Sequence, residues 1–111
     1  GAEAVENAIK ISYDHRKNRG YGICFYGAFH GRTLGALSLN RSKKVHRKWY
    51  PSVPTIAIPY VSGIRQCKCQ WTSKERSPKT MPKELLHIKK GIIDPKEIAY
   101  IIVEPIQGEG G

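Results

Sequence analysis

Ile98-Ala99-Tyr100-Ile101-Ile102-Val103 is the stretch that decides the fold, because six apolar residues follow one another without polar alternation. Such a run is typical of a strand in a parallel sheet that is covered on both faces. Residues 21–26 have the same aromatic and apolar character and predict a second buried strand, in which Cys24 is a small core residue. Residues 55–60 predict a third strand, which Pro59 interrupts.

Helices are predicted before and between these strands. Over residues 2–17, small and apolar side chains recur at steps of three and four, and Glu3 and Glu6 lie near the positive N-terminus of the helix. Residues 34–39 predict a short helix, and residues 83–90 a helix that ends at Gly91. Because helices and strands alternate along the chain, we expect an α/β fold with a mostly parallel sheet and flanking helices.

The positive charge of the chain, +10 in total, lies in its middle. Residues 41–97 hold fourteen Lys/Arg against four Asp/Glu, whereas residues 1–40 hold five against three. Residues 61–82 show no periodicity and predict a loop, so a solvated insertion explains this basic, loop-rich region better than a nucleic-acid-binding face. Trp49, Tyr50 and Trp71 keep a nucleic-acid-binding module as an alternative, and we expect Trp49 and Tyr50 to cover an apolar surface.

The cysteines and the hydropathy give further expectations. The three cysteines fit a reduced, cytoplasmic protein. Cys67 and Cys69 are two residues apart and do not match the CxxC pairs of zinc sites, so no metal site is expected. No apolar stretch reaches the roughly 18 residues of a membrane span, and no leader is visible, so no membrane partner is expected.

Two short segments combine residues that suit a cofactor and its substrate. Gly1-Ala2 precedes the first predicted helix, where free backbone N–H groups bind phosphate and glycine permits its close approach. Phe29-His30-Gly31-Arg32-Thr33 follows the strand at residues 21–26, at the end of a parallel strand where α/β sheets bind ligands. An aromatic ring can stack on a flat heteroaromatic cofactor, and an arginine fork matches a carboxylate. Helix capping by Gly1, and a packed Phe29 with solvent-facing polar neighbours, remain alternatives.

A third segment, Glu104-Pro105-Ile106-Gln107-Gly108-Glu109, follows the strand at residues 98–103. A carboxylate at the end of a buried strand is costly unless it meets a cation or a hydrogen-bond donor. Two carboxylates five residues apart, separated by Pro and Gly, therefore predict a shaped loop. A structural ion pair for Glu104 or Glu109 remains an alternative.

Three blocks, in this order and spacing, give the chain a family resemblance: Gly-Ala-Glu-Ala-Val-Glu-Asn-Ala-Ile-Lys, Phe-His-Gly-Arg-Thr-Leu-Gly-Ala-Leu-Ser-Leu and Ile-Ile-Val-Glu-Pro-Ile-Gln-Gly-Glu-Gly-Gly. The chain resembles the class III aminotransferases, and the last two blocks are highly specific for them. The resemblance implies pyridoxal phosphate (PLP) as cofactor and the fold-type-I architecture, with residues 1–111 as part of the PLP-binding large domain. Residues 41–97 match this family only loosely.

The resemblance also implies roles for residues near the cofactor. Gly1 and Ala2 match the turn whose backbone N–H groups hold the cofactor phosphate. Phe29 matches the aromatic residue that stacks on the pyridine ring, and His30 lies beside it. Glu104 matches a carboxylate near the cofactor and the reaction centre.

Substrate contacts follow from the same resemblance. Arg32 matches the arginine that binds the distal carboxylate of the substrate in 4-aminobutyrate enzymes. Glu109 matches the glutamate that pairs with a C-terminal arginine in the resting site and releases it when a dicarboxylic substrate binds. Gln107 is expected to be a nearby polar contact.

The implied reaction is transfer of an amino group from an ω-amino acid, such as 4-aminobutyrate, to a 2-oxo acid such as 2-oxoglutarate. Acetylornithine or ornithine aminotransferase is the alternative, because similar blocks occur in those branches. Nothing in the chain matches the Schiff-base lysine or the aspartate that meets the pyridine nitrogen, and both ends of the chain resemble mid-protein sequence. We therefore expect an internal fragment that is inactive alone and belongs to a homodimeric cytoplasmic enzyme.

Overall fold

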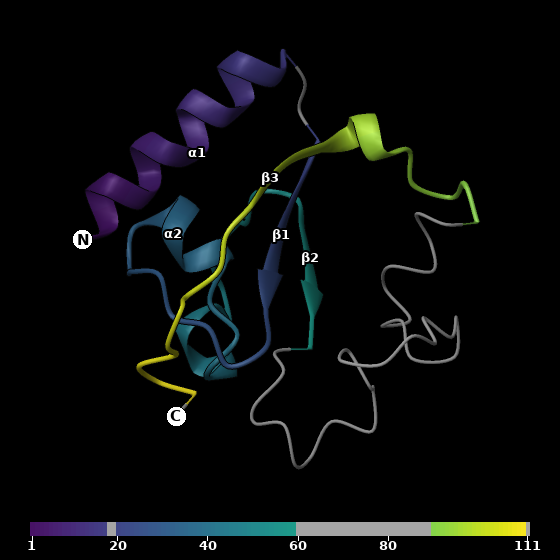
Figure 1. Ribbon diagram of the computed structural model, residues 1–111. Coiled ribbons are helices and arrows are strands. Elements are labelled where there is room, and N and C mark those ends of the chain that lie inside the picture. Colours follow the sequence, from purple (N-terminus) through teal and green to yellow (C-terminus); the bar gives the residue numbers. More distant parts are fainter. Residues whose placement is uncertain (18–19, 60–89, 111) are drawn as a thin grey trace.

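The computed structural model describes residues 1–17, 20–59 and 90–110. Its elements are arranged as shown in Figure 1, in the order α1 (Ala2–Arg16), β1 (Tyr21–Phe25), α2 (Leu34–Ser38), η1 (Lys44–His46), β2 (Thr55–Ile58), η3 (Pro95–Glu97) and β3 (Ile98–Ile101). The predicted helices at residues 2–17 and 34–39 and the three predicted strands are confirmed. The predictions for residues 61–82 and for most of 83–90 lie outside the described residues. No helix in the described ranges is both long and apolar enough to cross a membrane.

The three strands form one parallel sheet, as predicted, in the order β2-β1-β3. Ile23 of the central strand β1 pairs with Ile56 on one side and with Ile101 on the other. The backbone contact with β1 continues beyond β3, because the N–H of Ile102 donates to the carbonyl of Ile23 at 2.9 Å. All three strands therefore end at the same edge of the sheet, and the loops that follow β1 and β3 begin side by side.

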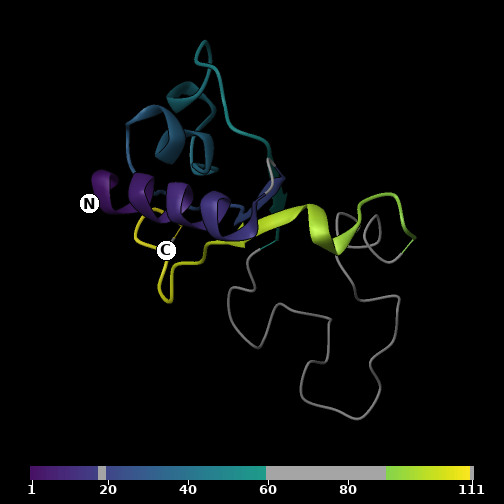
Figure 2. The same cartoon turned by 90° about the horizontal axis from the view of Figure 1, so that it is seen from above.

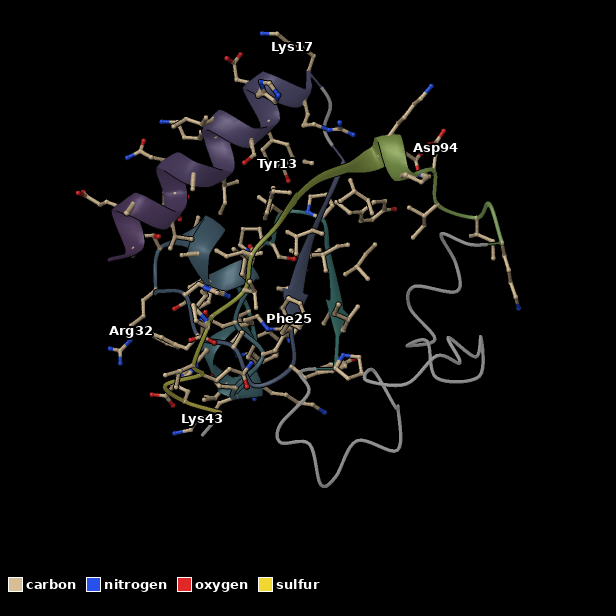
Figure 3. All side chains as sticks on the ribbon, in the orientation of Figure 1. Tyr13, Lys17, Phe25, Arg32, Lys43 and Asp94 are labelled. Carbon is tan, nitrogen blue, oxygen red and sulfur yellow. The ribbon has the colours of Figure 1, made fainter. Side chains whose placement is uncertain are left out.

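The core lies between the sheet and the two α-helices, which Figures 1 and 2 show beside the strands. Ile9 of α1, Cys24 of β1 and Leu39 after α2 form its centre, and Cys24 is fully buried as predicted. Burial raises the pKa of the Cys24 thiol. In Figure 3 Tyr13 points from α1 toward the strands, where its ring meets that of Tyr100 edge-on at a centroid distance of 5.7 Å.

The prediction that the strand at residues 98–103 is covered on both faces is wrong. Regular pairing stops at Ile101, and the side chains of Ile101 and Val103 are 64% and 52% exposed. β3 is an edge strand, and α1 packs against only one of its faces, through Tyr100 and Ile102. Within the described residues, the other face of β3 is therefore largely open to solvent.

The prediction that Trp49 and Tyr50 cover an apolar surface is also wrong. Their side chains are 83% and 59% exposed, in the irregular segment between η1 and β2. The contact of the Trp49 indole is with a charge, because the ammonium group of Lys48 lies 5.0 Å from the ring centroid. A cation above an aromatic face is a favourable contact that tolerates solvent, so the indole needs no apolar partner.

Candidate functional site

The N-terminus of α1 presents backbone N–H groups to open space. Gly1 is the N-cap residue, and no side chain caps the helix. The carbonyl of Gly1 accepts the first helical hydrogen bond, from the N–H of Ala4 at 3.0 Å, so the N–H groups of Ala2 and Glu3 precede the helical ladder. Apart from Gly1 itself and its neighbour Ala2, no atom of the described residues lies within 4 Å of the place where a Cβ on Gly1 would stand. This geometry suits an anion bound to the first turn of α1.

The loop formed by residues 29–33, called here the 29–33 loop, passes directly against this helix end. Gly31 has φ of 140°, a conformation that side-chain-bearing residues rarely adopt. A Cβ on Gly31 would stand 2.7 Å from the Cβ of Ala2 and 3.1 Å from the Cβ of Ala36. The close approach therefore requires glycine, and it brings the loop after β1 to the start of α1.

Two side chains outside the predicted site residues, Asn40 and Glu6, hold the 29–33 loop. The amide of Asn40 accepts a hydrogen bond from the N–H of His30 at 2.7 Å and donates one to the carbonyl of Gly31 at 2.8 Å. The carboxylate of Glu6 accepts hydrogen bonds from the hydroxyl of Thr33 and from the N–H of Ala36. The one signal in the sequence is that Asn40 ends a run of small and apolar residues, of which the structure buries residues 36–39 together with Asn40.

His30 and Glu104 come together at the carboxyl ends of β1 and β3. Burial lowers the pKa of the half-buried His30 imidazole below its ordinary value of 6.5, and the neighbouring Glu104 carboxylate opposes that shift. Nε2 of His30 is buried and has no hydrogen-bond partner among the described residues. At neutral pH the imidazole is therefore uncharged, and its buried Nε2 lacks the hydrogen bond that a buried polar atom usually makes.

Gln107 joins the loop after β3 to the loop after β1. Its amide donates to the carbonyl of Tyr26 at 2.8 Å, and the side chain is buried. Gly27 and Gly110 both lie against the oxygen of this amide, where neither has a side chain to obstruct it. In this structure the Gln107 side chain is thus a hydrogen-bonded link between the two loops.

The remaining predicted residues lie at the edge of this region. Arg32 and Glu109 are exposed, and in Figure 3 the Arg32 side chain points away from the strands. No hydrogen bond or ion pair of the Arg32 side chain occurs within residues 1–17, 20–59 and 90–110. The ring of Phe29 is half-buried and meets the His46 ring edge-on at 5.7 Å. The structure brings Gly1-Ala2, His30 and Glu104 to one end of the sheet, with Arg32 and Glu109 open to a ligand.

No metal centre is visible in the part of the chain that the structure describes, where no group of three or more His, Cys, Asp or Glu residues could hold an ion. Cys67 and Cys69 lie outside the described residues. The polar groups at the ends of the strands are backbone N–H groups, a neutral imidazole, carboxylates and an exposed guanidinium. The N–H groups and the guanidinium suit an anion.

Comparison with known families assigns the chain. The family model for aminotransferase class-III matches residues 1–111, so the chain belongs to the class III aminotransferase family. It is 35% identical to a 2-aminoadipate transaminase of Pseudomonas putida and 33% identical to a 4-aminobutyrate aminotransferase of Escherichia coli, in both cases over 100% of the chain. An ornithine aminotransferase of Bacillus cereus is 36% identical over the same extent. The chain spans 25%, 24% and 24% of the lengths of these three relatives.

Solved structures agree on the fold. A lysine aminotransferase from M. tuberculosis matches 100% of the chain with a TM-score of 0.66 and 24% identity, and the chain covers 27% of it. An S-selective transaminase from Arthrobacter sp. matches 99% of the chain with a TM-score of 0.63 and 18% identity, and the chain covers 25% of it. The expected α/β fold of the fold-type-I transaminases is therefore confirmed.

Proposed function

We propose that these residues are part of a PLP-dependent aminotransferase that moves an amino group from an ω-amino acid to a 2-oxo acid. The observation that carries the proposal is the meeting of an open helix N-terminus, a neutral half-buried imidazole and a carboxylate at the carboxyl ends of β1 and β3, the usual place for ligands in such sheets. When bound, PLP supplies an electron sink for the reaction. The chain's residues bind and orient the reactants.

The residues described above fit this cofactor. The N–H groups of Ala2 and Glu3 suit its phosphate, because the space next to Gly1 is open and the helix dipole favours an anion there. The free Nε2 of His30 and the Glu104 carboxylate are the polar groups that would lie near the cofactor ring. We assign the stacking role to Phe29, on the strength of its place directly before His30.

Arg32 and Glu109 are the proposed substrate contacts. Arg32 is exposed and directly follows Gly31, which lies against the start of α1, so its guanidinium can form a bidentate pair with a carboxylate distant from the reacting amine. We assign to Glu109 the role of forming an ion pair with an arginine elsewhere in the protein. This assignment makes 4-aminobutyrate the leading donor and 2-oxoglutarate the leading acceptor.

The proposed parent protein is longer than these 111 residues. Relatives are about four times longer, since the chain covers 24% of the E. coli 4-aminobutyrate enzyme. We assign residues 1–111 to the PLP-binding large domain, with residues 41–97 as a basic, loop-rich part of it. The catalytic lysine would come from another part of a cytoplasmic homodimer.

Two other functions compete with this proposal. An acetylornithine or ornithine aminotransferase fits the same blocks, and one relative is an ornithine aminotransferase. A nucleic-acid-binding module is the alternative from another class, favoured only by exposed basic and aromatic side chains such as Lys48 and Trp49. A filter-binding titration against salt tests it, because many phosphate contacts would give a steep negative slope.

The deciding experiment is a donor panel with the longer protein. PLP-loaded protein is mixed with 2-oxoglutarate and with 4-aminobutyrate, ornithine or acetylornithine in turn, and glutamate formation is measured. We expect the highest kcat/KM with 4-aminobutyrate. A preference for acetylornithine or ornithine would establish the alternative branch, and the absence of glutamate with every donor would refute transamination.

A further inference from the structure

Asn40 stands where it can fix the backbone on one side of Arg32. Its side chain is fully buried, and its amide binds the N–H of His30 and the carbonyl of Gly31. A buried amide is costly unless it is hydrogen-bonded, so these two bonds define both the Asn40 rotamer and the path of the loop. The main chain of Asn40 is itself held, by its N–H to the carbonyl of Leu37 at 3.1 Å and by Arg41, which donates to its carbonyl at 2.9 Å.

Glu6 fixes the backbone on the other side. Its carboxylate reaches from α1 to the hydroxyl of Thr33 and to the N–H of Ala36, which it meets at 2.9 Å. Gly35 lies directly against the carboxylate, so a side chain there would displace it. The Thr33 hydrogen bond is the main reason that the pKa of Glu6 lies below its ordinary value of 4.5, and the carboxylate is therefore charged at neutral pH.

Arg32 lies between these two attachments. On one side the His30 N–H and the Gly31 carbonyl are bound by Asn40, and on the other Thr33 is bound by Glu6. Gly31 is in addition pressed against Ala2. The Arg32 side chain is exposed, so the freedom that remains is its own rotamers rather than movement of the loop.

We infer that Asn40 and Glu6 are positioning residues for Arg32: they hold the loop backbone so that the guanidinium meets a substrate carboxylate in a fixed direction. The inference rests on the proposed function of Arg32 as the carboxylate contact. A two-pronged pair needs both donors aligned, so loosening the loop weakens substrate binding even though neither residue touches substrate.

Ser38 provides a matched control, because it is as buried as Asn40 but does not bind the loop. Its hydroxyl donates to the carbonyl of Leu34 and accepts from the N–H of Val53. A merely structural contribution of a buried polar group near α2 is therefore measured by Ser38→Ala. A contribution to the direction of Arg32 is measured only by the two positioning residues.

The test uses the longer protein loaded with PLP and measures kcat and KM for 4-aminobutyrate. Asn40→Asp keeps the acceptor for the His30 N–H and loses the donor to Gly31, and Glu6→Gln keeps an acceptor without the charge. Each is made in the wild-type protein and in Arg32→Gln. We expect each to raise KM about 3- to 10-fold with kcat nearly unchanged, as loss of one hydrogen bond suggests. In Arg32→Gln the same changes should leave KM within about 2-fold, and Ser38→Ala should lower stability without raising KM.

The outcomes distinguish the positioning role of Asn40 and Glu6 from the proposed function. Equal KM effects in both backgrounds, or no KM effect in an active protein, would overturn the positioning role and leave the proposed function standing. A wild-type protein that does not turn over 4-aminobutyrate or another ω-amino acid would overturn the proposed function, and this inference with it. If Asn40→Asp fails to fold, Glu6→Gln alone decides, since its partially exposed side chain tolerates substitution.

Discussion

Replacing Gly31 with alanine should be among the most damaging single-methyl changes in this chain. Two costs combine at this position. Holding a non-glycine residue at φ of 140° costs about 1–3 kcal/mol. The added Cβ would also stand 2.7 Å from the Cβ of Ala2 and 3.1 Å from that of Ala36, and forced overpacking of this kind costs about 1–3 kcal/mol. We expect Gly31→Ala to lower the free energy of unfolding by about 2–6 kcal/mol.

Two other glycines separate these costs. Gly91 has φ of 74° but, among the described residues, no atom within 4 Å of an added Cβ, so Gly91→Ala measures the backbone cost, about 1–2 kcal/mol. Gly108 has neither feature, and Gly108→Ala should change stability by less than about 0.5 kcal/mol. Urea unfolding followed by circular dichroism gives all three values. If Gly31→Ala cost no more than Gly91→Ala, the 29–33 loop would not lie against α1 as described.

Four further predictions concern the site and the chain alone. Arg32→Lys in the longer protein should weaken binding of the ω-amino acid by about 1–3 kcal/mol through loss of the guanidinium fork, with PLP content unchanged; loss of PLP with normal substrate affinity would contradict it. Glu109→Ser should raise the half-reaction rate with glutamate relative to that with 4-aminobutyrate, because the arginine proposed to pair with Glu109 loses its partner. Equal losses with both substrates would make Glu109 structural. The contribution of His30 to the free energy of unfolding should be fully present above pH 6.5 and should be lost as the pH falls through the lowered pKa of His30, because the unfolded chain then binds more protons than the folded chain. His30→Gln should flatten this part of the profile of urea midpoint against pH, and an unchanged profile would count against a buried neutral imidazole. The 111-residue chain alone should show no turnover, and borohydride reduction with PLP should give scattered adducts on exposed lysines such as Lys10, Lys43, Lys44 and Lys90; one stoichiometric adduct with turnover would contradict this.

Much of the fold could be predicted because the signals are local. The helical spacing of apolar residues in α1 and the short apolar runs of β1 and β2 depend only on neighbours in sequence. The edge position of β3, which leaves one of its faces largely exposed, could not be predicted in this way. Whether a strand lies at the centre or the edge of a sheet depends on strand order, and here the more central position belongs to β1 although β3 has the longer apolar run.

The candidate site could also be predicted only where the signals are local. Strand ends and glycines marked the segments that contain Gly1, His30 and Glu104, and the structure brings these together. Asn40 and Glu6 carried no such mark. Their partners lie nine or more residues away and become neighbours only when α2 turns back beneath the 29–33 loop and α1 packs beside it.

In the proposed site, the start of α1, His30 and Glu104 surround one PLP, and Arg32 is directed at the substrate carboxylate. A crystal structure of the longer protein with PLP and a bound ω-amino acid analogue tests this arrangement. We predict the phosphate within hydrogen-bonding distance of the Ala2 and Glu3 N–H groups, and the analogue carboxylate on the Arg32 guanidinium. A phosphate bound away from the first turn of α1, or a carboxylate held by another cation while Arg32 faces solvent, would contradict the account.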